Sequence, residues 1–282
     1  AQEGALLGGY AFDKYLAKPS KPLPVQLVVK TDALPGLRRT LATERETLAC
    51  VNFARDVLNE PANVIFPQSL AEAFQSFGGE AGLRVTVWNE KRLEKERCEG
   101  ILSVGKGSSW KPRLVIGRYA PKNAKGHLAL VGKGVTFDTG GYCLKTAAGQ
   151  KGMKMDMGGA AMVFGAACAI ARAELPIQVS VYTPLAHNDI SSTAYHTTDV
   201  LTMRSGRTVQ VDNTDAEGRL ILADALDVAK EDEPDWIIDA ATLTGAAVVA
   251  LGEDIAAAYG TNRDFTASLL EAAAEVGEYL WE

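Results

Sequence analysis

Histidine and paired cysteine, the residues that hold most protein zinc ions, are scarce in this sequence. The only histidines are His127, His187 and His196, which lie far apart, and no HExxH motif occurs. The four cysteines form no CxxC pair, which argues against a structural zinc site or a disulfide framework and favours free thiols in a reducing, cytoplasmic compartment. The GxSxG motif of a serine nucleophile elbow is also absent.

Charge and apolar runs argue against two further classes of partner. A net charge of -6 argues against nucleic acid, because a phosphate-backbone binder needs clustered Lys and Arg. The longest apolar runs are interrupted by Gly, Cys and Arg, so no run of transmembrane length and no membrane partner are expected. The opening residues lack the basic start of a signal peptide and also lack an initiator Met, which suggests that the chain begins within a longer protein.

Predicted strands and helices alternate along the chain, and several strands are continuously apolar. This pattern predicts an α/β fold with a mostly parallel sheet and helices on both faces. Strands are expected at 25–30, 83–88, 100–105, 112–119, 127–132, 177–185 and 235–240. Helices are expected at 37–59, 67–77, 89–97, 158–173 and around 222–229, and the fourth is apolar nearly all round, as in a buried helix.

One segment comes close to a phosphate-binding loop. It reads GILSVGKG, but Gly107 replaces the Ser or Thr that would hold magnesium. We therefore interpret it as a strand followed by its exit turn.

Three segments carry the candidate chemistry. Lys133 and Asp138 lie in a Gly-rich loop after a buried strand, VGKGVTFDTGG, and Asp156 precedes the buried helix in KMDMGGAA. Asp215 and Glu217 occur in NTDAEGRL, where residues two apart point the same way if the turn is extended.

Each segment has an ordinary structural interpretation when taken alone. An isolated DxE is usually a solvated loop, a Gly-rich turn is often just a turn, and a Gly-Gly helix start usually reflects close packing. Together, however, four acids at the carboxyl edge of one sheet would repel one another unless cations neutralised them. The combination therefore suggests two divalent metal ions.

These segments closely resemble the cytosolic leucyl aminopeptidase family. NTDAEGRL is the signature octapeptide of that family, and VGKGVTFDTGG, MKMDMGGAA, ARDVLNEPAN and DAATLTGA are similar to other family segments. The resemblance runs from near residue 5 to the end. It implies the tail of an amino-terminal domain at 1–36, a linker helix at 37–60 and a catalytic metallopeptidase domain at 61–282, incomplete at its carboxyl end.

The resemblance also implies a set of metal ligands. The tighter metal ion would be held by Lys133, Asp138, Asp156 and Glu217. The second would be held by Asp138, Asp215 and Glu217. Lysine can serve as a ligand only when neutral, and a bound dication would lower its pKa. The expected ions are Zn²⁺ or Mn²⁺, with Mg²⁺ or Co²⁺ as alternatives.

Further roles follow from the same resemblance. Lys145 would steady the oxyanion, and Arg219 would hold a bicarbonate ion that acts as general base. The substrate would contact Met153, Thr242, Leu243 and Gly245.

The implied function is a metal-dependent aminopeptidase. A two-metal-activated water would remove the first residue, preferably an aliphatic one such as leucine, from peptides with a free amino terminus. The parent protein is expected to be a homo-hexamer. A non-catalytic role in DNA binding or assembly is the alternative, but it is disfavoured because the acidic balance opposes DNA binding and the ligand set, Lys145 and Arg219 are all present.

Overall fold

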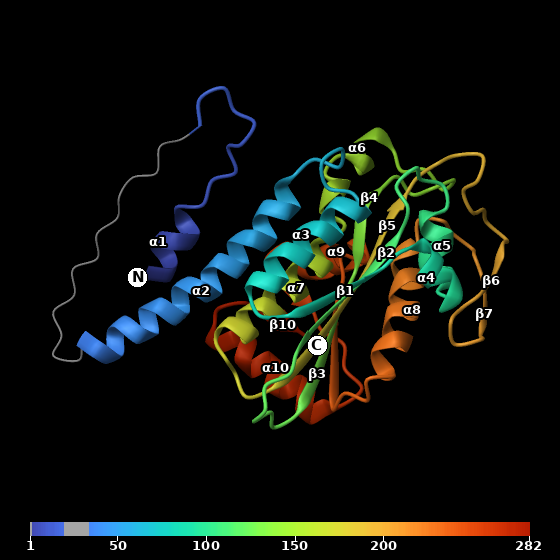
Figure 1. Ribbon diagram of the computed structural model, residues 1–282. Coiled ribbons are helices and arrows are strands. Elements are labelled where there is room, and N and C mark those ends of the chain that lie inside the picture. The colour runs from blue at the N-terminus through green and yellow to red at the C-terminus, as the bar shows by residue number, and fades with distance from the viewer. Residues whose placement is uncertain (1, 20–33) are drawn as a thin grey trace. The chain divides into compact units, whose positions relative to one another are not determined.

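The computed structural model describes residues 2–19 and 34–282, which form two compact units (Figure 1). The first unit ends at Thr242, and the second covers Leu243–Glu282. The strand predicted at 25–30 lies outside the described residues, as does part of the predicted domain at 1–36.

Six strands form the sheet of the first unit, among the residues described. They are β1 (Arg84–Trp88), β2 (Arg113–Tyr119), β3 (His127–Gly132), β4 (Gly134–Asp138), β5 (Gln178–Asn188) and β8 (Trp236–Ala240). The order is β1-β2-β5-β3-β8, and β4 also pairs with β5. Strand β2 runs antiparallel to both neighbours, whereas the pairs β3–β5, β3–β8 and β4–β5 are parallel. The prediction of a mostly parallel sheet is therefore confirmed only in part, because the sheet is mixed.

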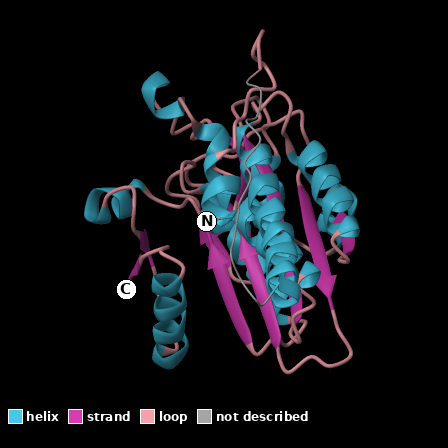
Figure 2. Ribbon diagram, turned by 90° about the vertical axis from the view of Figure 1, so that its left-hand side faces the viewer, coloured by secondary structure: helices cyan, strands magenta, loops and turns pink. Residues whose placement is uncertain are grey.

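Helices cover both faces of this sheet, as predicted. One core contains side chains from α2 (Leu34–Asn59), α3 (Pro67–Glu80) and α7 (Gly158–Arg172), which stand in front of the strands in Figure 2. The other core contains side chains from α4 (Glu90–Lys95), α5 (Glu99–Gly105) and α8 (Glu217–Lys230). Strand β2 serves both cores, since Leu114 and Ile116 join the second and Val115 the first.

The strand predicted at 100–105 is wrong, because this segment is helix α5. Ile101 and Val104, three residues apart, are fully buried in the core shared with α8. A Cβ at Gly100 would lie 2.3 Å from the carbonyl oxygen of Leu220, so the missing side chain lets the two helices approach. Interpreting the loop-like GILSVG run as a strand and exit turn was therefore wrong as well.

The buried helix α7 is confirmed, but its hydropathy exceeds the prediction. The stretch Met153–Arg172, which contains η1 and α7, spans 20 residues, and 18 consecutive residues within it reach a mean hydropathy of 1.2, enough by length and composition to cross a membrane. The prediction that no run reaches this length is therefore wrong. Burial of 56% of those 18 residues marks the stretch as part of the core.

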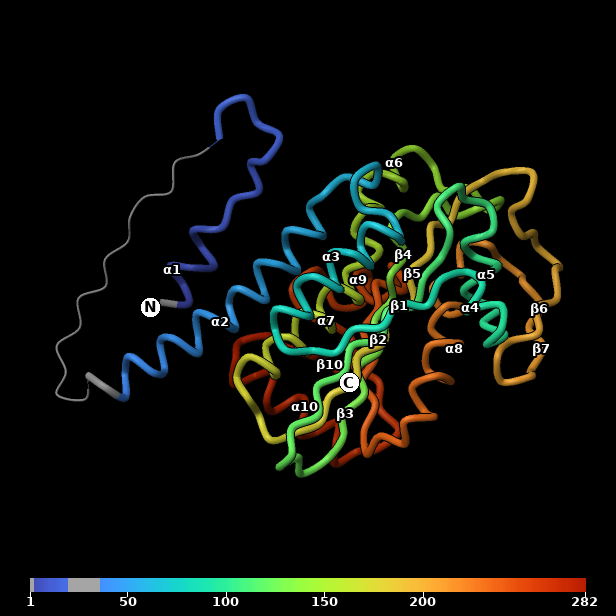
Figure 3. The backbone as a smooth tube through the Cα atoms, viewed as in Figure 1, coloured from blue at the N-terminus to red at the C-terminus, as the bar shows by residue number. Residues whose placement is uncertain are grey.

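The remaining elements are short, and Figure 3 traces their order along the chain. In the first unit they are α1 (Gln2–Gly8), α6 (Ala147–Gln150), the 3₁₀ turn η1 (Met153–Met155) and the hairpin β6 (Val200–Thr202) and β7 (Thr208–Gln210). The second unit contains α9 (Gly245–Leu251), β9 (Ala256–Ala257), α10 (Arg263–Glu275) and β10 (Leu280–Trp281).

Candidate metal centre

The predicted ligands lie at the ends of elements in the first unit. Strand β4 ends at Asp138, helix α8 begins at Glu217, and Lys133 occupies the single-residue break between β3 and β4. Asp156 directly follows η1, and its carbonyl oxygen accepts a hydrogen bond from the Val135 amide at 3.2 Å. Three segments distant in sequence therefore converge near the carboxyl ends of parallel strands.

Three carboxylates gather closely at this edge. Asp138, Asp156 and Glu217 are all buried, and one oxygen from each lies within 4.8 Å of the others. The Lys133 Nζ lies 2.7 Å from Asp156 Oδ1 and 2.8 Å from Glu217 Oε1. Lys133 also donates to the carbonyl oxygen of Thr242 at 2.8 Å. Its amine is thus surrounded by oxygen atoms.

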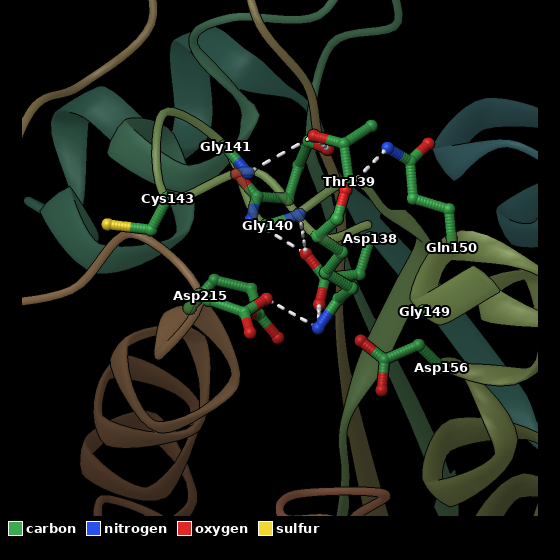
Figure 4. Close-up of polar contacts among 12 residues, drawn as sticks. Asp138, Thr139, Gly140, Gly141, Cys143, Gly149, Gln150, Asp156 and Asp215 are labelled. Atoms are coloured by element: carbon green, nitrogen blue, oxygen red, sulfur yellow. Dashed lines mark hydrogen bonds and ion pairs between the residues drawn. The ribbon is translucent and has the colours of Figure 1, made fainter. Parts of the chain in front are cut away.

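A second lysine links the cluster to the fourth acid. The Lys145 Nζ lies 2.8 Å from Asp138 Oδ2 and also forms an ion pair with Asp215. Figure 4 shows Asp215 and Asp156 approaching the space beside Asp138 from different sides. Asp138 Oδ1 accepts hydrogen bonds from the Gly140 amide at 2.9 Å and from Asn188 Nδ2 at 2.8 Å.

Crowding and burial change the acidity of this cluster. Burial raises the pKa of Asp156 to about 7, although Lys133 opposes the shift. Burial and the nearby charge of Asp138 also raise the pKa of Asp215. Burial alone would lower the pKa of Lys133, but Glu217 and Asp156 outweigh it, so this pKa is raised. The acids therefore require positive charge close by, and the two lysines provide it here.

The donor set fits divalent metal ions. Asp156 Oδ2 and Glu217 Oε2 are buried and find no hydrogen-bond donor within the described parts of the chain. Buried carboxylate oxygens are normally satisfied, so a cation is the simplest missing partner. A cluster of carboxylate oxygens with one amine suits Mn²⁺ or Zn²⁺.

Two glycines make this arrangement sterically possible. A Cβ at Gly218 would lie 2.7 Å from Lys133 Cε and 2.9 Å from its Nζ, so any side chain there would require the end of the lysine side chain to shift. Gly140 has a φ of +87°, and a Cβ there would lie 2.6 Å from the Cys143 carbonyl oxygen. The loop after Asp138 therefore depends on glycine for its path.

The other predicted residues lie in different surroundings. Arg219 is exposed on α8, and Met153 is half-buried at the start of η1. Thr242 is near the acids, since its Oγ1 donates to Asp156 Oδ1 at 2.8 Å. Leu243 and Gly245 belong to the second unit. The roles of all these residues stay predictions.

Sequence reasoning missed three residues that support the acids. Asn188 and Tyr195 both donate to the carbonyl oxygen of Thr214, at 3.1 and 2.7 Å. Thr214 Oγ1 in turn donates to the Gly140 carbonyl oxygen at 2.7 Å. Two signals were available, because Thr214 lies within NTDAEGRL and Asn188 is a polar residue at the end of strand β5, where α/β sheets place functional groups.

The family model and the curated relatives that match this chain share one description. The family model "Cytosol aminopeptidase family, catalytic domain" matches residues 52–282. A probable cytosol aminopeptidase of Leifsonia xyli subsp. xyli is 46% identical over 284 residues, covering 99% of this chain and 56% of the relative. One of Rhodococcus jostii is 45% identical, covering 100% of this chain and 57% of the relative. The chain thus spans about half the length of these curated relatives.

Solved structures agree with the sequence relatives. The bottromycin maturation enzyme BotP in complex with Mn superposes with a TM-score of 0.91 at 36% identity, covering 99% of this chain and 60% of that one. A cytosol aminopeptidase from Coxiella burnetii gives a TM-score of 0.88 at 35% identity, covering 100% of this chain and 59% of that one. The family match over 52–282 and these likenesses together show that the chain belongs to the cytosol aminopeptidase family.

Proposed function

We propose that the protein is a metal-dependent aminopeptidase that removes the first residue from peptides with a free amino terminus. The observation that carries this proposal is the buried cluster of Asp138, Asp156 and Glu217, with two carboxylate oxygens that lack a donor among the described residues. The printed names of the relatives, cytosol aminopeptidases, support the same activity.

Two ions would share this cluster. Lys133, Asp138, Asp156 and Glu217 would hold the tighter ion. Asp138, Asp215 and Glu217 would hold the other. When bound, the ions would supply a polarised water and a polarised substrate carbonyl. Manganese is the first ion to test, because the BotP structure is described as a complex with Mn, and zinc is the second.

Lys145 has the properties needed to stabilise an oxyanion. Burial lowers its pKa, but hydrogen bonds to Asp138 and Asp215 outweigh this effect and raise the pKa, so the amine stays protonated at neutral pH. A fixed ammonium beside the acids would stabilise negative charge that develops on the substrate oxygen. Its contacts with Asp138 and Asp215 keep it at the site before substrate binds.

Arg219 and the predicted pocket residues complete the proposal. Arg219 is exposed on the first turn of α8, two residues after Glu217, and its guanidinium would hold bicarbonate as the general base. Met153 and Thr242 would favour an aliphatic first residue such as leucine. Leu243 and Gly245 would bind the peptide backbone. We further propose a cytoplasmic homo-hexamer, and light scattering of the purified protein would test the assembly.

The central experiment compares two substrates and two variants. The Mn²⁺-loaded protein should hydrolyse a leucyl reporter with a free amine and leave its amino-acetylated form intact. Lys145→Met should lower kcat by about 100-fold or more while retaining Mn²⁺. Lys122→Met, an exposed surface change, is the matched control and should behave as wild type. Equal hydrolysis of free and acetylated substrates would contradict the proposed function.

A further inference from the structure

Asn188, the last residue of β5, is fully buried and bonds to two of the three metal-binding segments. We propose that Asn188 is a positioning residue, which holds Asp138 in register with the segment that carries Asp215 and Glu217. This inference rests on the metal site of the proposed function. It assigns Asn188 no contact with the reacting atoms.

The side-chain amide nitrogen of Asn188 donates two hydrogen bonds. Nδ2 donates to Asp138 Oδ1 at 2.8 Å and to the Thr214 carbonyl oxygen at 3.1 Å. An amide nitrogen carries two hydrogens, so both acceptors are served at once. The reversed amide would place Oδ1 against a carboxylate and a carbonyl, which fixes the orientation of the side chain.

The backbone of the same residue holds the loop that follows Asp138. The Asn188 carbonyl oxygen accepts from the Thr139 amide at 3.1 Å and from Thr139 Oγ1 at 2.9 Å. Asp138 and Asn188 are also partners in the β4–β5 ladder. The Asn188 side chain therefore restrains the Asp138 carboxylate, and its main chain restrains the backbone at Asp138 and Thr139.

The far side of the contact is equally restrained. Tyr195 donates its hydroxyl to the Thr214 carbonyl oxygen, and Thr214 Oγ1 accepts from the Cys143 amide at 2.7 Å. Thr214 directly precedes Asp215, so the position of Thr214 fixes the position of the Asp215 backbone. Asn188 thus connects Asp138, which is predicted to contact both ions, with Thr214. Thr214 is the neighbour of Asp215, which is predicted to contact only the second ion.

Asparagine suits this position better than its close relatives. Aspartate would place a second carboxylate against Asp138 and would remove both donors. Leucine would fill a similar volume but would leave Asp138 Oδ1 with one donor fewer. If Asn188 fixes the distance between Asp138 and Asp215, loss of its amide should make that distance more variable. The affinity for the second ion should then fall more than the affinity for the first.

The test measures Mn²⁺ affinity in Asn188→Ala and Asn188→Leu, with Ser180→Ala as the matched control. Ser180 lies on the same strand, is fully buried, and its side chain forms a hydrogen bond with His127 Nε2 at 2.9 Å, away from the three metal-binding segments. Calorimetric titration should show 10- to 100-fold weaker binding of the second Mn²⁺ in the Asn188 variants. Ser180→Ala should bind Mn²⁺ as wild type does, even if its metal-free melting temperature falls.

Two results would overturn the inference. The first is that the Asn188 variants bind both Mn²⁺ ions with wild-type affinity, while their metal-free melting temperature falls as it does in Ser180→Ala. The second is wild-type protein that binds no Mn²⁺. Because affinity is the deciding readout, wild-type protein that binds Mn²⁺ but cleaves no free-amine peptide would overturn the proposed function alone.

Discussion

The Lys133 side chain, which reaches Asp156 and Glu217, passes through the space that a Cβ on residue 218 would occupy. In Gly218→Ala the new Cβ would lie within 3 Å of three Lys133 atoms, and Glu217 is the adjacent residue. We therefore expect Lys133 to be displaced and Mn²⁺ affinity to fall by about 10-fold or more. Calorimetric titration measures the change.

A glycine in open space provides the control for this substitution. Gly79 lies exposed in α3, and a Cβ there would meet no atom within 4 Å. Gly79→Ala should stabilise the protein by about 0.5–1 kcal/mol, because alanine restricts the unfolded chain more than glycine does, and should leave metal binding unchanged. Unaltered Mn²⁺ affinity in Gly218→Ala would show that metal binding does not depend on a glycine beside Lys133.

The four acids should not contribute equally to the two ions. Asp215 is the most exposed of them, with 30% of its side chain accessible, and it contacts Lys145 rather than Lys133. Asp215→Asn keeps the side-chain shape and removes the charge, so binding of the second Mn²⁺ should weaken about 10- to 100-fold. The first Mn²⁺ should remain bound. Equal loss of both ions in a titration would refute this division of ligands.

At the scale of single residues, much of the site could be predicted and its support could not. Lys133, Asp138, Asp156, Asp215 and Glu217 lie in motifs that resemble a known family, so local sequence was informative. Asn188 lies between two other polar residues, His187 and Asp189, and its partners are 50 and 26 positions away. Nothing in the neighbouring sequence indicates such pairs, because they arise only when β5 is aligned with β4 and with the segment that precedes α8.

At the scale of elements, periodicity identified most helices and strands but failed for α5, for the direction of β2, and for β4, because Gly134–Asp138 is a strand and not part of the expected Gly-rich loop. A six-residue apolar run such as GILSVG fits a buried strand and a buried helix equally well. Strand direction is likewise not encoded in an apolar run. Strand β2 lies between β1 and β5 and is antiparallel to both, which only pairing reveals.

The carboxyl end of α2 is joined to the metal-binding turn by Lys154. Its Nζ donates to the carbonyl oxygen of Asn59, the last residue of the helix, and Asp156 lies two residues further on. Lys154→Met keeps the aliphatic chain and removes the donor, so the unfolding free energy should fall by ~1 kcal/mol. Lys91→Met, exposed on α4, is the control. Identical urea midpoints for both variants would contradict this capping role.

Contact between α5 and α8 should depend on pH through Asp224. Its carboxylate accepts from the Ile101 amide at 3.1 Å and from the Arg204 amide at 3.1 Å, and burial raises its pKa to about 6. The unfolded value is about 3.9, so the folded state holds the proton more tightly. Stability from this group is therefore present below about pH 4 and is lost as pH rises through about 6.

Comparison with Asp224→Asn isolates this dependence, since asparagine does not titrate. Urea unfolding at several pH values should show wild type losing on the order of 2 kcal/mol relative to the variant between pH 4 and pH 7. A free-energy difference that stays constant across this range would mean that the pKa of Asp224 is not raised in the folded protein.

At the scale of the whole molecule, the metal cluster should couple binding to folding. Asp156 and Glu217 are buried acids paired with Lys133, and each has one carboxylate oxygen without a donor among the described residues. These groups disfavour the metal-free fold, whereas a bound dication would neutralise their charge. Mn²⁺ at 100 times its dissociation constant should add about 2.7 kcal/mol. For a protein of this size the melting temperature should rise by roughly 5 °C. Calorimetry after chelation and after Mn²⁺ addition measures the shift.

Sodium chloride at equal ionic strength controls for screening, and Glu217→Gln controls for the site, because it removes one of the three clustered acids. A rise that sodium reproduces, or that Glu217→Gln retains in full, would show that the stabilisation comes from elsewhere than this cluster.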